Sequence, residues 1–78
     1  MKNVTIYSTP TCHFCKIAKD FFAEHNIEYV NKDVTTNKEF AGEMINKSGQ
    51  MGVPVIFVDN EMVIGFDEPR LWELLEIK

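Results

Sequence analysis

The sequence contains no apolar segment long enough to cross a lipid bilayer. Its longest continuous apolar run, residues 53–58, is far shorter than the roughly 20 residues of a membrane-spanning helix, so we expect no membrane contact. Segment 4–7 already has the pattern of a strand, and neither the apolar region nor the cleavage site of a secretory signal precedes it. We therefore expect a cytoplasmic protein.

Basic residues are also scarce. Lysine and arginine number 8 against 12 aspartates and glutamates, which gives a formal net charge of −4. Proteins that bind nucleic acids carry clusters of lysine and arginine that neutralise phosphates, and the sequence has no such cluster. The composition therefore excludes nucleic acid as an expected partner.

Glycine and proline, with 4 and 3 residues, are too few for a flexible linker, and no internal repeat is visible. The hydrophobic fraction of 45% and the charged fraction of 26% are those of an ordinary globular protein. A chain of 78 residues is long enough for one small core and no more. We predict a single domain over residues 1–78, and we expect a monomer.

Strand and helix patterns follow one another along the chain. The apolar run 53–58 suits a strand buried on both faces, and Asp59 with Asn60 suits a two-residue hairpin turn. Strands are predicted at residues 4–7, 27–33, 53–58 and 61–64, and helices from residue 14 to 25 or 26, from the capping residues 35–37 to Gly49, and over residues 68–75.

This order, βαβαββα, predicts an α/β fold. Strands separated by a helix pair in parallel, whereas the closing hairpin adds an antiparallel pair. We therefore expect a four-stranded mixed sheet flanked by three helices.

The sequence has only 2 cysteines, Cys12 and Cys15. A disulfide enclosing two residues would constrain the unfolded chain very little, so reactivity explains the pair better than structural stabilisation. Cys12 lies after a strand and at the start of a helix, where free backbone N–H groups favour a thiolate. Cys15, one helical turn later, can resolve a mixed disulfide formed on Cys12. We predict both as catalytic residues.

Two other interpretations of this pair have less support. Two small apolar residues in a core would show the same spacing. A structural zinc site needs four ligands, and the only further candidates among the soft ligands, His13 and His25, do not have zinc-finger spacing. We expect no bound metal and no resident cofactor.

The residues around the cysteines each have a functional and a structural interpretation. His13 tunes the thiolate or is an ordinary surface histidine. Phe14 contacts a docking peptide or packs at the start of the helix. Lys16 and Lys19 add positive potential or only solvate the outer helix face, and Lys16 is the stronger candidate for the first role.

Three motifs together give the chain its resemblance to the glutaredoxin family. They span almost its whole length, and the resemblance implies a thioredoxin-like fold. The motifs are residues 4–8 followed by Cys12, Cys15 and Lys16, then residues 52–58, then residues 65–67.

The resemblance also implies roles for residues outside the cysteine motif. Pro54 is expected to be cis and to face the cysteines, and the backbone of Val53 is expected to pair with a bound peptide or glutathione. Gly65, Phe66 and Asp67 correspond to the loop that holds the γ-glutamyl end of glutathione, with Asp67 as the contact.

By this resemblance the protein is a redox-active dithiol–disulfide oxidoreductase that serves electron transport and cell redox homeostasis. It would reduce disulfides in proteins or mixed disulfides of glutathione. His13 stands where classical members have proline, Thr9 where many have lysine or arginine, and Gly65 where they have a glycine pair. These departures leave two reductants open, glutathione and thioredoxin reductase.

The residues that follow Gly65 are also similar to those of redoxins that serve ribonucleotide reductase, which makes that enzyme a candidate partner. Two alternatives of other classes stay open. Two chains could share an iron–sulfur cluster or a soft metal through Cys12, or the domain could be an interaction module that has lost its chemistry.

Overall fold

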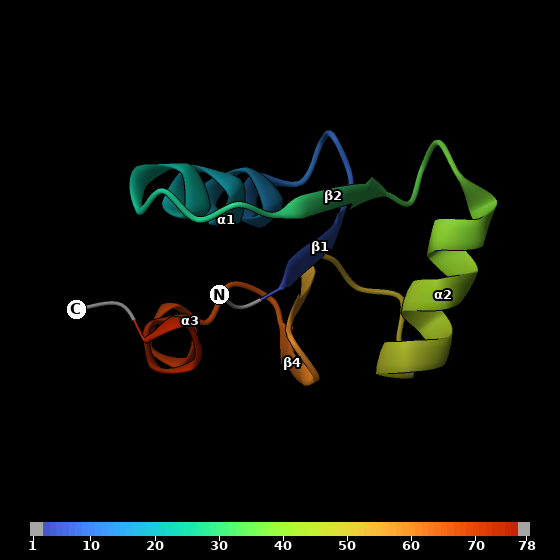
Figure 1. The fold of residues 1–78 in the computed structure, drawn as a ribbon. Coiled ribbons are helices and arrows are strands. Elements are labelled where there is room, and N and C mark those ends of the chain that lie inside the picture. Colours follow the sequence, from blue (N-terminus) through green and yellow to red (C-terminus); the bar gives the residue numbers. More distant parts are fainter. Residues whose placement is uncertain (1–2, 77–78) are drawn as a thin grey trace.

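The computed structural model describes residues 3–76, so residues 1–2 and 77–78, at the ends of the predicted domain, lie outside the described residues. The predicted order βαβαββα is confirmed (Figure 1). The elements are β1 (Val4–Ser8), α1 (His13–Glu24), β2 (Val30–Asp33), α2 (Lys38–Ser48), β3 (Val55–Val58), β4 (Glu61–Ile64) and α3 (Glu68–Leu75).

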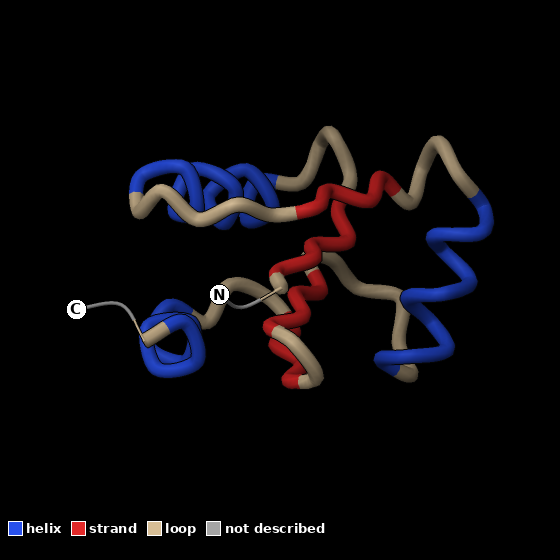
Figure 2. Tube along the Cα trace, viewed as in Figure 1, coloured by secondary structure: helices blue, strands red, loops and turns tan. Residues whose placement is uncertain are grey.

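The four strands form one mixed sheet in the order β2-β1-β3-β4 (Figure 2). β1 pairs in parallel with β2 and antiparallel with β3, and β3 pairs antiparallel with β4. Val58 faces Glu61 across the last pair, so a two-residue turn joins β3 and β4 as predicted. β1 and β3 are therefore the two central strands.

The helices cover the two faces of the sheet unequally. α1 and α3 lie on one face and α2 lies alone on the other (Figure 1). Successive side chains of a strand point to opposite faces, so Ile56 joins the core under α1 and α3, whereas Val55 and Phe57 pack on the α2 side. The prediction that this strand is buried on both faces is confirmed.

The connection between α1 and β2 is longer than predicted. α1 runs from His13 to Glu24 with His25 as its C-cap, close to the predicted end at about residue 25 or 26. Asn26 has a left-handed φ of 56°, and the Ile27 N–H donates to the Phe22 carbonyl at 2.8 Å. In this helix-ending geometry the Ile27 N–H is bonded to the helix and cannot pair with a neighbouring strand. β2 therefore begins at Val30 and not at residue 27.

β3 begins two residues later than predicted, at Val55 instead of residue 53. Pro54 has no N–H to donate to the ladder, and its carbonyl accepts instead from the Gly65 N–H at 2.8 Å. Val53 and Pro54 therefore form a loop in front of the sheet. The predicted end of the second helix at Gly49 is confirmed, because Gly49, with a φ of 72°, is the C-cap of α2.

A polar network ties α2 to the sheet. The buried Tyr7 hydroxyl donates to the Glu43 carboxylate, and Lys32 Nζ on β2 donates to the same carboxylate at 2.7 Å. Lys47, on α2 itself, approaches it at 3.4 Å. The hydrogen bonds from Lys32 and Tyr7 lower the pKa of Glu43 from 4.5 to about 2.

This network predicts a specific loss of stability in acid. A carboxyl group whose pKa is lower in the folded state stabilises the fold above its unfolded pKa and loses that effect as the pH falls through the folded value. Glu43→Gln should therefore lower the free energy of unfolding by about 1 kcal/mol at pH 7 and have little effect near pH 2. Urea unfolding at both pH values measures this, with the exposed Glu39→Gln as control. Equal losses at both pH values would contradict the assignment.

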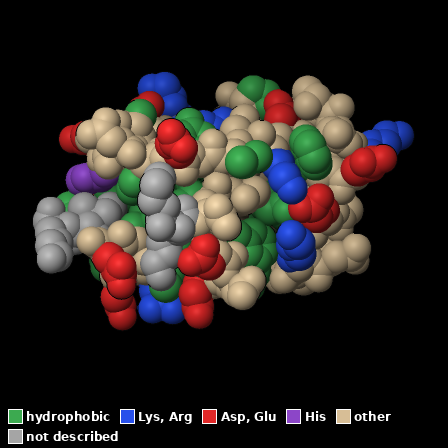
Figure 3. All heavy atoms as spheres, viewed as in Figure 1, with side chains coloured by type: hydrophobic (Ala, Val, Ile, Leu, Met, Phe, Trp, Pro, Cys, Tyr) green, Lys and Arg blue, Asp and Glu red, His purple; other side chains and the backbone are tan. Residues whose placement is uncertain are grey.

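Charges of both signs are distributed over the surface. On the face seen in Figure 3, acidic and basic side chains of the described residues are interspersed, and none of its patches consists of lysine and arginine alone. Within residues 3–76, no helix combines the length and the apolar character that a bilayer crossing requires.

Candidate active site

Cys12 is the N-cap residue of α1. It follows a tight turn in which its N–H donates to the Thr9 carbonyl at 3.3 Å, and its own carbonyl accepts the Lys16 N–H at 3.2 Å. Its sulfur accepts the Cys15 N–H at 3.2 Å. The N–H groups of a helix's first turn have no intrahelical acceptor, and they carry the positive end of the helix dipole. A negative charge on the Cys12 sulfur is stabilised by this geometry.

Cys15 has the opposite environment, because its side chain is completely buried. Burial, followed by the hydrogen bond with the Cys12 side chain, raises the pKa of Cys15 from 9.0 to about 12. At neutral pH Cys15 is therefore a protonated thiol. The two sulfurs differ in exposure, since Cys12 is partly accessible and Cys15 is buried, as a nucleophile and a resolving thiol require.

This difference predicts selective alkylation of the native protein. Iodoacetamide at pH 8 should modify Cys12 alone, because Cys15 is buried and stays protonated until the pH approaches 12. Mass spectrometry should find a single adduct per native chain and a second one only after unfolding in guanidinium. Comparable labelling of Cys15 in the native state would contradict its assigned burial.

Lys19 adds positive charge near Cys15. Its positive charge lowers the pKa of Cys15 and so opposes part of the effect of burial. Lys16, the stronger candidate from the sequence, instead approaches Asp20 at 3.6 Å on the exposed side of α1. The structure thus places Lys16 in a surface ion pair, and its role in adding positive potential at the cysteines stays a prediction.

The loop before β3 brings Val53 and Pro54 to the cysteines. The Val53–Pro54 peptide is cis, as the resemblance implies. The Val53 carbonyl lies 3.9 Å from the Cys12 sulfur. In the chain from residue 3 to residue 76, the Val53 N–H has no hydrogen-bond acceptor. An open backbone edge therefore stands beside the nucleophile.

Gln50 shapes this loop, and no sequence pattern predicted this role. Its carboxamide accepts from the Gly52 N–H and donates to the Gly52 carbonyl at 3.1 Å, so it satisfies both backbone groups of Gly52. The Ser48 hydroxyl, bonded to the Met44 and Gln50 carbonyls, holds the start of the same loop. The backbone of Gly52 is therefore paired, whereas the N–H of the neighbouring Val53 has no acceptor among the described residues.

The segment after β4 meets the proline loop. Gly65 has a φ of 77°, a conformation that favours glycine, and its N–H donates to the Pro54 carbonyl at 2.8 Å. Asp67 caps α3 by accepting the Arg70 N–H at 3.3 Å. Phe66 packs edge-to-face on Phe21, with ring centroids 5.6 Å apart. Asp67 and Phe66 thus each have a structural role, whatever they contact in a substrate.

Two apolar side chains next to the reactive segments are exposed. Phe14, two residues after Cys12, is 57% exposed, and Met51, two residues before Val53, is 77% exposed. The exposed His13 lies beside Phe14, with ring centroids 5.6 Å apart. Phe14 is therefore only partly packed at the helix start, and its contact with a docking peptide stays a prediction. Met51 was missed because a methionine in a loop has no periodic pattern.

The arrangement supports thiol–disulfide exchange. It places an accessible sulfur at a helix N-terminus, a buried thiol one turn away and an open backbone edge beside them. Over residues 3–76, no group of three or more histidine, cysteine, aspartate and glutamate side chains is arranged to hold a metal ion.

Comparisons with known proteins agree with this geometry. Residues 4–63 match the family model described as glutaredoxin. An uncharacterised glutaredoxin-like protein of Clostridium pasteurianum is 38% identical over 73 residues, which cover 94% of this chain and 97% of the relative. Glutaredoxin 3 of Escherichia coli K12 is 34% identical over 68 residues, covering 87% of this chain and 82% of the relative.

Solved structures show the same fold. A thioredoxin-like protein superposes with a TM-score of 0.92 over 100% of both chains, at 29% identity. A glutaredoxin from Archaeoglobus fulgidus superposes with a TM-score of 0.86, covering 96% of this chain and 87% of the other, at 25% identity. The predicted thioredoxin-like architecture is confirmed.

Proposed function

The chain belongs to the glutaredoxin family, and we propose that it reduces protein disulfides and mixed disulfides of glutathione through Cys12 and Cys15. The family and the fold support a thiol–disulfide oxidoreductase role. The observation that carries the proposal is the Cys12 sulfur at the N-cap of α1, within 3.2 Å of the Cys15 N–H and beside the open backbone of Val53.

The proposed reaction has two exchange steps. The Cys12 thiolate attacks one sulfur of the substrate disulfide and releases the other as a thiolate, which leaves a mixed disulfide on Cys12. Cys15 then loses its proton and attacks the Cys12 sulfur, and the second substrate sulfur leaves. The substrate gains two electrons. The protein loses them and is left with a disulfide between Cys12 and Cys15.

The raised pKa of Cys15 delays its attack until the first step has occurred. Burial is the largest cause of the raised pKa of Cys15, and the hydrogen bond and the charge of Cys12 raise it further. When Cys12 enters a mixed disulfide, its negative charge disappears, so ionisation of Cys15 becomes easier at that moment. Cys15 is thus protected as a thiol until there is a disulfide for it to resolve.

Substrates are proposed to bind along the Val53 edge. An extended peptide can pair with the free N–H of Val53, in the way that strands add to open backbone edges. Exposed Phe14 and Met51 offer apolar contacts to its side chains. The preferred substrates are therefore extended, accessible protein segments that contain a disulfide, with ribonucleotide reductase as one candidate in the cytoplasm.

The reductant decides which branch of the family the protein belongs to. NADPH oxidation would be followed with a disulfide substrate and either glutathione plus glutathione reductase, or thioredoxin reductase alone. We expect turnover with at least one system. Absence of turnover with both, together with visible absorbance after anaerobic purification, would replace the proposal by the cluster-binding alternative.

Asp67 can be tested apart from its capping role. Asparagine caps helices as well as aspartate does, so Asp67→Asn should keep α3 and remove only the charge. If the carboxylate binds the γ-glutamyl end of glutathione, the KM for glutathione mixed disulfides should rise about 5-fold or more, while the melting temperature stays the same. An unchanged KM would leave Asp67 with the capping role alone.

A further inference from the structure

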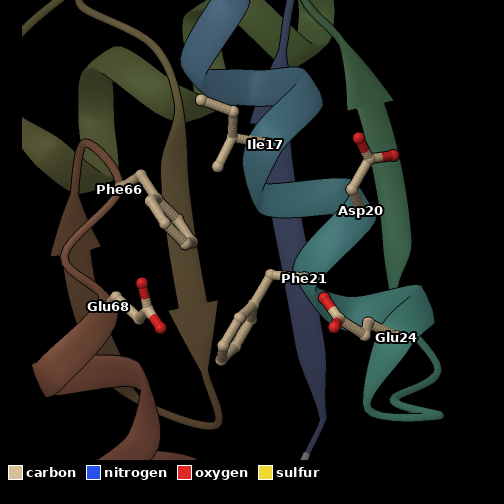
Figure 4. A pocket seen from close by; sticks show the side chains of 6 residues that line it. All are labelled: Ile17, Asp20, Phe21, Glu24, Phe66 and Glu68. Atoms are coloured by element: carbon tan, nitrogen blue, oxygen red, sulfur yellow. The ribbon is translucent and has the colours of Figure 1, made fainter.

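A pocket lies between α1 and the segment that leads into α3. It encloses about 230 Å³ and is lined by Ile17, Asp20, Phe21, Glu24, Phe66 and Glu68. Figure 4 shows the rings of Phe21 and Phe66 between the two elements, with the Glu68 carboxylate beside them. The pocket shares Phe66 with the loop after β4, and its apolar floor and acidic rim distinguish it from the cysteine pair itself.

The charges of the pocket are all of one sign. Three of its six lining residues are carboxylates and none is basic. Asp20 is partly compensated by the exposed Lys16 at 3.6 Å, and Glu68 accepts the Trp72 indole N–H at 3.2 Å. Among the described residues, Glu24 has no hydrogen bond or ion pair. Within residues 3–76, the rim therefore keeps at least one carboxylate, Glu24, that is not paired.

We propose that this pocket binds a lysine or arginine side chain of a protein substrate while the substrate's disulfide reacts at Cys12. The methylene stem of such a side chain would pack on Ile17, Phe21 and Phe66, since long cationic side chains cover apolar surface with their stems. Its charged head would face the carboxylates and the aromatic rings, which both attract cations. This inference rests on the proposed function and adds a charge preference to it.

The pocket lies within reach of a substrate that is bound at Cys12. His13, Ile17, Asp20 and Glu24 recur at spacings of four, three and four residues, so they share one face of α1 that begins next to Cys12. Ile17 is about 8 Å and Glu24 about 18 Å beyond Cys12 along the axis, at about 1.5 Å per residue. An extended peptide covers about 3.3 Å per residue. The basic residue should therefore lie roughly three to five positions from the reacting cysteine.

The test uses pre-reduced protein and single-turnover reduction of peptide disulfides, so that the reductant does not matter. Two peptide pairs carry arginine or its uncharged analogue citrulline four residues before or after the cysteine. In at least one pair, we expect the arginine peptide to react about 3- to 10-fold faster at low salt. The preference should shrink in 0.5 M NaCl.

Two double variants separate the pocket from the overall charge. Glu24→Gln with Glu68→Gln should reduce the arginine preference to about 1-fold. Glu28→Gln with Glu39→Gln removes the same charge from residues outside the pocket and should leave the preference intact. Loss of preference in both double variants would overturn the pocket and leave only long-range attraction.

The remaining outcomes are also distinct. Equal rates for arginine and citrulline in both pairs would overturn the pocket proposal while the proposed function stands. A peptide with norleucine in place of arginine is a further comparison. If it reacts faster than the arginine peptide, the proposal is overturned, because the pocket would then select an apolar side chain. If no peptide is reduced, the proposed function fails and the pocket proposal fails with it.

Discussion

Replacing Cys12 by serine should lower the rate of disulfide reduction by at least about 1,000-fold. A serine hydroxyl stays protonated at neutral pH and is a poor nucleophile towards a disulfide sulfur, so the first exchange step has no attacking group. The loss should appear in the second-order rate constant for a peptide disulfide, measured with pre-reduced protein.

Serine is a well-matched substitution because it is itself a favoured N-cap residue. Its hydroxyl can accept the Cys15 N–H that the Cys12 sulfur accepts now, so α1 should keep its start. Circular dichroism and the melting temperature should therefore match those of the wild type. Equal activity of the variant and the wild type would refute the assignment of Cys12 as the nucleophile.

Replacing Cys15 by serine should stop the reaction after its first step. Cys12 can still attack, but no second thiol can release the substrate, so a mixed disulfide should accumulate to nearly one per chain. Mass spectrometry without added thiol would detect this adduct, whereas the wild type should show very little of it. The expected difference in trapped adduct is more than about 10-fold, since resolution within the chain outcompetes dissociation.

The Cys15 variant also needs a control for packing. Serine is smaller and more polar than cysteine at a position that is completely buried, so some loss of stability is expected. Cys15→Ala removes the thiol without adding a polar group and should trap the same adduct. If both variants release substrate as fast as the wild type, Cys15 is not the resolving residue.

The order of elements and the cysteine chemistry could be predicted because their signals are local. Cys12 and Cys15 lie within one helical turn, and the cap at Asn37 lies within two residues of the N–H that it binds. Apolar periodicity likewise reports a face of one helix or strand. Each of these patterns is complete within a few consecutive residues.

The errors arose where distant residues or backbone geometry decided the outcome. Residues 27–29 have a strand-like composition, but the hydrogen bond from Ile27 to Phe22 ends the preceding helix there. Lys16 pairs with Asp20 on the exposed side of α1, a contact that depends on the side-chain directions of the folded helix. The acidic pocket joins Phe21 to Phe66, residues far apart in the sequence. No local pattern contains this information.

The free backbone of Val53 has a consequence for the range of proteins that can be served. An amide N–H is the same in every peptide-binding loop, and the partner carbonyl that it would meet is present in every residue of every polypeptide. A contact of this kind cannot tell one amino-acid sequence from another. Backbone pairing at Val53 would thus bind different substrate proteins equally well. Any selectivity between substrates must come from side-chain contacts elsewhere on the protein's surface.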